Sequence, residues 1–226
     1  MDAERLEHVR GIFKGSLLNL KDTLLLMASL TDRNLTLALG AYLERDDDKA
    51  LMVEREDNVI DRLEVDIDDM VVTYLATHGP MATECRMAFC ASKISPALEG
   101  IADQAVSIAR RARHLNGLAE VRSGVDILPM GKMVLTMIRE AINAFVEVKP
   151  GQAAPIVLED KQLDEANRDH ERRLHRIMAE DTRNIPAYIH IMFISRALEK
   201  AGDYAKQIAE EVHYLYTAQD IRHERR

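Results

Sequence analysis

An internal repeat restricts the possible folds of this chain more than any other feature. Residues 94–109 and 194–209 share nine identities in sixteen aligned positions, where chance would give roughly one or two. The segment around Asp57 and Asp61 aligns with that around Asp160 and Asp164 at an offset of 103. We therefore predict two homologous units and a tail, at residues 5–117, 124–217 and 218–226.

Hydrophobic periodicity predicts that each unit is made of helices. Apolar residues recur at spacings of three and four, and the same stripe returns one hundred positions later, at 98, 101, 105, 108, 112 and 115 and at 198, 201, 205, 208, 212 and 215. Ten glycines and six prolines in 226 residues are few for an architecture of strands and turns. The prediction is an all-α fold of two tandem three-helix bundles, with six long antiparallel helices.

Charge and cysteine usage exclude several classes of function. Thirty basic and 38 acidic residues give a net charge of −8, which is unfavourable for binding a phosphate backbone, so no nucleic-acid partner is expected. The amino-terminal sequence is charged and lacks the apolar stretch of a signal peptide, and no membrane insertion is predicted. Cys85 and Cys90 lie five positions apart, so they form neither a CxxC redox pair nor a metal knuckle. A cytoplasmic protein with reduced thiols is expected.

Acidic residues spaced four apart are the main candidates for a functional site. In each unit such a pair lies on the third helix and another on the second, so that four carboxylates converge if these helices are neighbours. Carboxylates bind Mg²⁺, Mn²⁺, Ca²⁺ or iron rather than forming a thiolate zinc site. The predicted metal ligands are Asp57, Asp61, Glu99 and Asp103 in the first unit, and Asp160, Asp164, Glu199 and Asp203 in the second.

Chance and simpler explanations have to be weighed against this metal site. With 38 acidic residues, about six such pairs arise at random, and most acidic pairs are solvated surface. The recurrence at one helical phase in both units favours metal binding, although duplication alone can carry inert charge. Glu210 and His213 form a single Glu-x-x-His without the second copy that a di-iron site requires. No nucleophile, nucleotide or metalloprotease motif occurs, so no enzymatic activity is predicted.

The third helix of each unit resembles a known family motif. The sequence ALEKAGDYA at residues 197–205, followed by IAEEVHYL at 208–215 and TAQDIRH at 217–223, is similar to the end of PhoU-family proteins. The family motif is commonly LERIGDHA. Its Arg is replaced here by Gly100 and Lys200, and its Gly by Ala102 in the first unit. Glu64 aligns with Asn167, which makes the two predicted sites unequal.

The resemblance implies a regulatory role in phosphate uptake. PhoU-family proteins are non-enzymatic adaptors that link the phosphate ABC transporter, through its ATPase, to a sensor histidine kinase and hold the phosphate-starvation response off. The family's ExxxD carboxylates bind multinuclear metal centres, so divalent or iron-type ions are expected here: Mg²⁺, Mn²⁺, Fe or Zn²⁺. A homodimer is also expected, since the bundles offer further faces for packing.

Three other interpretations remain open from the sequence. The chain could be a carboxylate-bridged di-metal protein or metal store, which would require a buried site and a redox partner. It could be an accessory of a different phosphate transporter. It could also be a plain helical interaction module, in which the carboxylates serve only solubility.

Overall fold

The computed structural model describes residues 3–222, with side chains from residue 16 onward. Residues 223–226 of the predicted tail and the side chains of residues 5–15 lie outside this description. No strand occurs between residues 3 and 222, which confirms the all-α prediction. The long helices are α1 (Ala3–Leu43), α2 (Asp47–His78), α3 (Ala82–Asn116), α4 (Ile127–Glu147), α5 (Ala153–Glu180) and α6 (Ile185–Thr217), with short 3₁₀ turns η1 (Pro150–Gln152) and η2 (Thr182–Asn184).

Local sequence signals set the helix ends. The carboxylate of Asp46 accepts a hydrogen bond from the backbone N–H of Lys49 at 3.1 Å and so caps the start of α2. Asp126 caps α4 in the same way, accepting from Leu128 N at 3.0 Å. Gly79 ends α2 in the left-handed region, at φ +52°. These caps define both ends of α2 and the start of α4, and hence the position of the carboxylates along α2.

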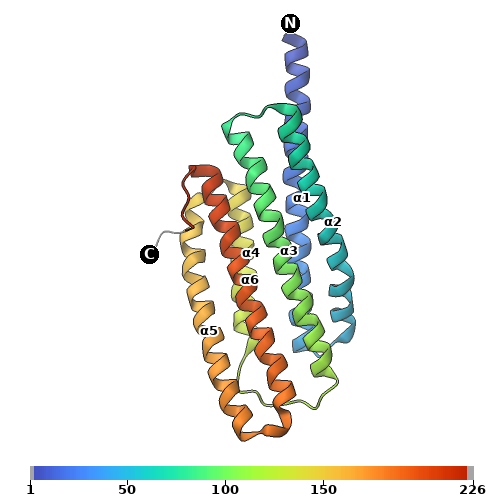
Figure 1. The fold of residues 1–226 in the computed structure, drawn as a ribbon, viewed down its shortest axis with the longest axis vertical. Coiled ribbons are helices and arrows are strands. Elements are labelled where there is room, and N and C mark those ends of the chain that lie inside the picture. The colour runs from blue at the N-terminus through green and yellow to red at the C-terminus, as the bar shows by residue number, and fades with distance from the viewer. Residues whose placement is uncertain (1–2, 223–226) are drawn as a thin grey trace.

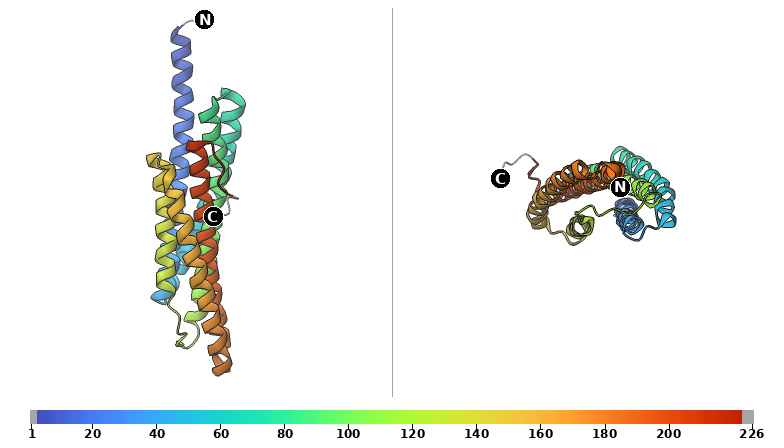
Figure 2. Two further views of the ribbon diagram at one scale, coloured as in Figure 1. Left: turned by 90° about the vertical axis from the view of Figure 1, so that its left-hand side faces the viewer. Right: turned by 90° about the horizontal axis from the view of Figure 1, so that it is seen from below.

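The six helices form two three-helix bundles arranged in two layers. Helices α1 to α3 make the first bundle and α4 to α6 the second, and α3 and α6 pack along each other at the centre (Figure 1). Viewed from one end, α5, α6, α3 and α2 form a curved layer, with α4 and α1 on one side of it (Figure 2). Helices α2 and α5 therefore lie at the two outer flanks, each beside the third helix of its own unit.

The buried stripes of α3 and α6 join both bundles into one hydrophobic core. Every position of the predicted stripe is buried in both helices, from Leu98 to Leu115 and from Leu198 to Leu215. Core residues of α1 and α4, among them Met27 and Phe145, belong to the same continuous cluster. Burial of this apolar surface is the main source of stability for the fold.

Within residues 3–222, no helix contains a segment long and apolar enough to span a bilayer.

Candidate functional site

The first unit brings five carboxylates together on the outer face of α2 and α3. The spacing of four puts Asp57, Asp61 and Glu64 along one side of α2, and α3 adds Glu99 and Asp103. We call these five side chains the first carboxylate set. Four of them were predicted as ligands from the sequence. Glu64 was noted in the sequence only through its alignment with Asn167, and the structure adds it to the set because its charge raises the pKa of Glu99.

The carboxylates of α2 and α3 are close enough for their charges to affect one another's pKa. The pKa of Glu99 rises to about 7, first through burial and then through the charges of Asp103, Glu64, Asp61 and Asp57, in that order. The pKa of Asp57 rises to about 6, first through burial and then through Asp61 and Asp103, while Arg110 opposes the shift. Like charges in a partly buried position favour the protonated form. The first set therefore holds more negative charge than its surroundings stabilise.

No basic side chain neutralises the first set by direct contact. Among side chains of residues 16–222, none of the five carboxylates has an ion pair within 4.0 Å. The neighbouring arginine Arg113 contacts Glu54 instead, at 3.3 Å. Such a cluster of repelling carboxylates gains stability from any cation that binds between them.

The second unit has the equivalent carboxylates, but a lysine lies among them. Lys206 Nζ on α6 donates to Asp160 Oδ2 of α5 at 2.6 Å and to Asp203 Oδ1 at 2.9 Å. Arg168 pairs with Asp164 at 3.2 Å. We call Asp160, Asp164, Glu199 and Asp203 the second carboxylate set; the sequence predicted all four members, and Lys206 was missed.

Burial is the largest influence on the pKa values of Glu199 and Asp160 in the second set. The pKa of Glu199 is raised by burial first, and then by Asp203 and Asp164. Burial also raises the pKa of Asp160, against the opposing effect of Lys206. Burial lowers the pKa of Lys206, but its bonds to Asp160 and Asp203 outweigh that effect and hold the ammonium firmly protonated.

A surface hollow adjoins the second set. It has a volume of about 460 Å³ and is lined by Glu199, Asp203, Asn167, Glu171, Arg196 and Lys200, among others. Asn167, which stands where the first unit has Glu64, accepts a hydrogen bond from Ser195 Oγ at 2.9 Å. The second set therefore has one acidic side chain fewer, in agreement with the inequality noted in the sequence.

Neither set forms a preformed coordination site with three or more ligands among the side chains of residues 16–222. Among the side chains of residues 16–222, no three His, Cys, Asp or Glu are placed to hold one ion. Ions such as Mg²⁺ keep several waters and bind through only one or two carboxylates, so the donor chemistry of the first set suits a hydrated ion. Any ion held by three or more protein ligands would require side-chain rotation.

The weaker candidates from the sequence have structural contacts instead. His213 Nδ1 lies 3.0 Å from the carbonyl oxygen of Pro150, so the Glu210–His213 pair gains no support as a di-iron element. Cys90 is buried, and burial raises the pKa of its thiol to about 12, whereas Cys85 is exposed.

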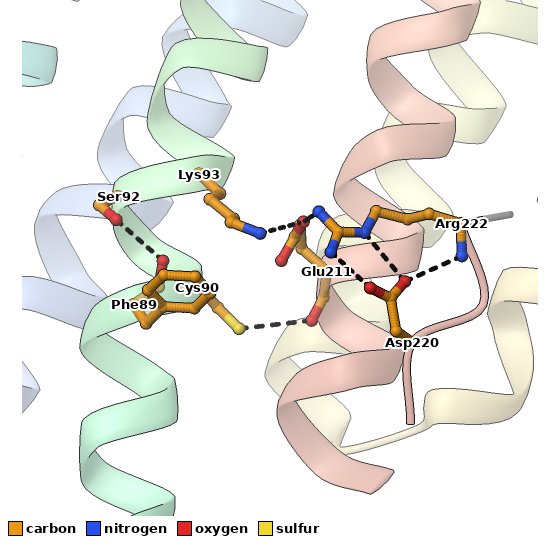
Figure 3. A network of polar contacts seen from close by, with 7 residues as sticks. All are labelled: Phe89, Cys90, Ser92, Lys93, Glu211, Asp220 and Arg222. Atoms are coloured by element: carbon orange, nitrogen blue, oxygen red, sulfur yellow. Dashed lines mark hydrogen bonds and ion pairs between the residues drawn. The ribbon is translucent and has the colours of Figure 1, made fainter. Parts of the chain in front are cut away.

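A polar network connects Asp220 and Arg222, which follow α6, to the α3–α6 pair (Figure 3). The buried carboxylate of Glu211 is contacted by Lys93 Nζ at 3.1 Å and by Arg222 Nη1 at 3.3 Å. Arg222 also donates to Asp220 Oδ1 at 2.9 Å, and Cys90 Sγ lies 3.5 Å from the Glu211 carbonyl oxygen. These contacts hold residues 218–222 against the helices. Local sequence patterns could not predict them, because Lys93 and Glu211 are 118 positions apart.

Comparison of the sequence with known proteins identifies a matching domain family and similar proteins in bacteria. The PhoU domain family matches residues 24–112 and 127–212. The chain is 33% identical over 217 residues to a phosphate-specific transport system accessory protein PhoU homolog of Pseudomonas putida, covering 96% of this chain and 85% of that protein. It is 30% identical to phosphate-specific transport system accessory protein PhoU of Escherichia coli, covering 96% and 90%.

Solved structures agree with the sequence relatives. The crystal structure of PhoU from Pseudomonas aeruginosa matches with a TM-score of 0.89 at 33% identity, covering 92% of this chain and 100% of that one. The phosphate transport system regulatory protein PhoU from Streptococcus pneumoniae matches with a TM-score of 0.84 at 23% identity, which shows the shared fold.

Proposed function

Because the chain belongs to the PhoU family, we propose that it is an accessory and regulatory protein of phosphate transport, and that it represses the phosphate-starvation response when phosphate is plentiful. One observation carries this proposal: both PhoU repeats are present, and the similarity to accessory proteins of the phosphate-specific transport system extends over 96% of the chain. The protein acts without catalysis, by contact with its partners.

The partners in this proposal are the ATPase of the phosphate ABC transporter and a sensor histidine kinase, met in the cytoplasm. Long helices leave wide outer faces for such contacts. Exposed apolar side chains on α2 support this use, since Val65 is 60% exposed and Val72 is 66% exposed. A homodimer through one of these faces is part of the same proposal.

The proposal also includes metal binding by the carboxylate sets. Mn²⁺ or Mg²⁺ bound at the first set would relieve the repulsion among Asp57, Asp61, Glu64, Glu99 and Asp103. Support comes from the absence of any ion pair to these five side chains among residues 16–222, and from the raised pKa of Glu99 and Asp57. Asp160, Asp164, Glu199 and Asp203 carry the same donor chemistry, with Lys206 already among them.

A reporter assay tests the regulatory role. Expression from a phosphate-starvation promoter is measured in high-phosphate medium, in cells with the gene, without it, and with the gene restored. The proposal predicts that the promoter is active in the deletion strain despite ample phosphate and silent again after complementation. A promoter that stays silent in the deletion strain would refute the repressor role and favour an accessory of another transporter.

A further inference from the structure

Position 206 distinguishes the two repeats at their carboxylate sets. In the internal alignment Glu99 and Asp103 correspond to Glu199 and Asp203, and three residues further on Val106 corresponds to Lys206. Val106 is 4% exposed and belongs to the hydrophobic core. The first unit therefore has the buried apolar side chain of Val106 at the position where the second unit has the ammonium group of Lys206.

The ammonium of Lys206 occupies the position of a bridging cation. It contacts carboxylates from two different helices, Asp160 of α5 at 2.6 Å and Asp203 of α6 at 2.9 Å. Asp160 is only 6% exposed, so water cannot stabilise its charge and a close counter-ion is required. Charge-assisted hydrogen bonds of this length are among the stronger polar contacts in proteins.

We propose that Lys206 is the resident cation of the second carboxylate set, and that it keeps divalent cations from binding there. Metal binding by this chain is then confined to the first unit. This inference rests on the metal-binding part of the proposed function, because it states which of the two sets a cation can enter.

Two physical effects support the exclusion. A divalent cation at Asp160 and Asp203 would lie beside a fixed positive charge, and it would have to break both hydrogen bonds of Lys206. The second set also has the neutral Asn167 in place of Glu64, and Arg168 already pairs with Asp164. Among the side chains of residues 16–222, no Lys, Arg or His forms an ion pair with the five carboxylates of the first set.

The test counts Mn²⁺ ions by equilibrium dialysis of the full chain. The E99Q/D103N variant disables the first set, and we expect it to lose most of the Mn²⁺ bound by the wild type. Adding K206M in that background should restore Mn²⁺ binding at the second set. K206R is the matched control, since it keeps the positive charge and should leave binding low. A further D203N substitution should remove the Mn²⁺ gained with K206M.

The mirror substitution tests the same idea in the first unit. V106K places an ammonium where the second unit already accommodates one, and we expect the affinity for Mn²⁺ to fall by at least about tenfold. This measurement decides the question if the K206M variant fails to fold, which circular dichroism would reveal.

The outcomes separate this inference from the metal-binding proposal itself. Wild-type binding with no gain from K206M in the E99Q/D103N background would overturn the role of Lys206 and leave the first metal site standing. Full Mn²⁺ binding by E99Q/D103N without the K206M substitution would also overturn the role of Lys206. A wild type without bound Mn²⁺ and a K206M variant that gains it would refute the first site but support Lys206. If neither protein binds Mn²⁺, both claims are wrong.

Discussion

The ring of Tyr204 on α6 occupies the space that a side chain at Gly100 on α3 would need. A β-carbon built at Gly100 would lie 2.6 Å from Cζ of Tyr204, closer than real contacts allow. This contact joins the two repeats at the centre of the fold, where α3 and α6 pack together. It also explains why the first unit departs from the family motif at position 100, since an Arg there would collide with the ring.

Replacing Gly100 by Ala should therefore destabilise the protein. Overpacking of a well-packed interface costs about 1–3 kcal/mol, whereas Gly→Ala in an unhindered helix stabilises by up to about 1 kcal/mol. Denaturant unfolding of Gly100→Ala measures the difference. Gly151→Ala is the matched control, because no atom lies within 4 Å of a β-carbon there. A Gly100→Ala variant as stable as the wild type would mean that Tyr204 moves aside freely.

The stability of the metal-free protein should depend on the charge of Glu99. Folding raises the pKa of Glu99 from its ordinary 4.5 to about 7. The folded state therefore binds a proton that the unfolded state has lost, and the free energy of unfolding falls as pH rises between these values. Glu99→Gln should match the wild type near pH 4 and exceed it at pH 7.5, by on the order of 1 kcal/mol.

Urea unfolding at several pH values, with a chelator present, measures this effect. Glu120→Gln, which changes an exposed carboxylate in the loop after α3, is the control and should show no comparable pH dependence relative to the wild type. A constant stability difference between Glu99→Gln and the wild type across this pH range would contradict the account.

Divalent cations should stabilise the wild type at neutral pH. A ligand that binds only the folded state at one hundred times its dissociation constant adds about 2.7 kcal/mol. Thermal denaturation with and without Mn²⁺ measures the shift in Tm. The shift should be largely absent in E99Q/D103N and retained in D66N/D69N, which removes the same charge from exposed positions on α2. Equal shifts in both variants would indicate weak, delocalised ion binding.

The Glu211 network should respond unequally to removal of its partners. The side chain of Glu211 is 8% exposed, against 29% for Lys93 and 41% for Arg222. The double variant K93M/R222M leaves a buried carboxylate unpaired and should cost about 3 kcal/mol of unfolding free energy. Glu211→Gln leaves two cations that can reach water and should cost much less. Similar losses in the two variants, measured by denaturant unfolding, would be evidence against this asymmetry.

Periodic features of the fold could be predicted from the sequence. The stripe from Leu98 to Leu115 is buried as expected, because helix period alone determines which face is apolar. The spacing of four also places Glu99 and Asp103 on one face, and the hairpin of α2 and α3 brings Asp57 beside them.

Contacts between distant elements could not be predicted in this way. In the internal alignment Lys206 corresponds to Val106. The alignment does not show that the Lys206 ammonium contacts Asp160 on the neighbouring helix. The fit of Tyr204 against Gly100 depends on how the two units pack, which no local pattern records. The same holds for the contact of Lys93 with Glu211.

The proposed repression and the proposed cation binding meet in one prediction, that the first carboxylate set is required for repression of the phosphate-starvation response. Reporter output in high phosphate, in a deletion strain complemented at equal protein levels with wild type, E99Q/D103N or D66N/D69N, tests it most directly. The account predicts an active promoter with E99Q/D103N and a silent one with the wild type and D66N/D69N. Full repression by E99Q/D103N would contradict it.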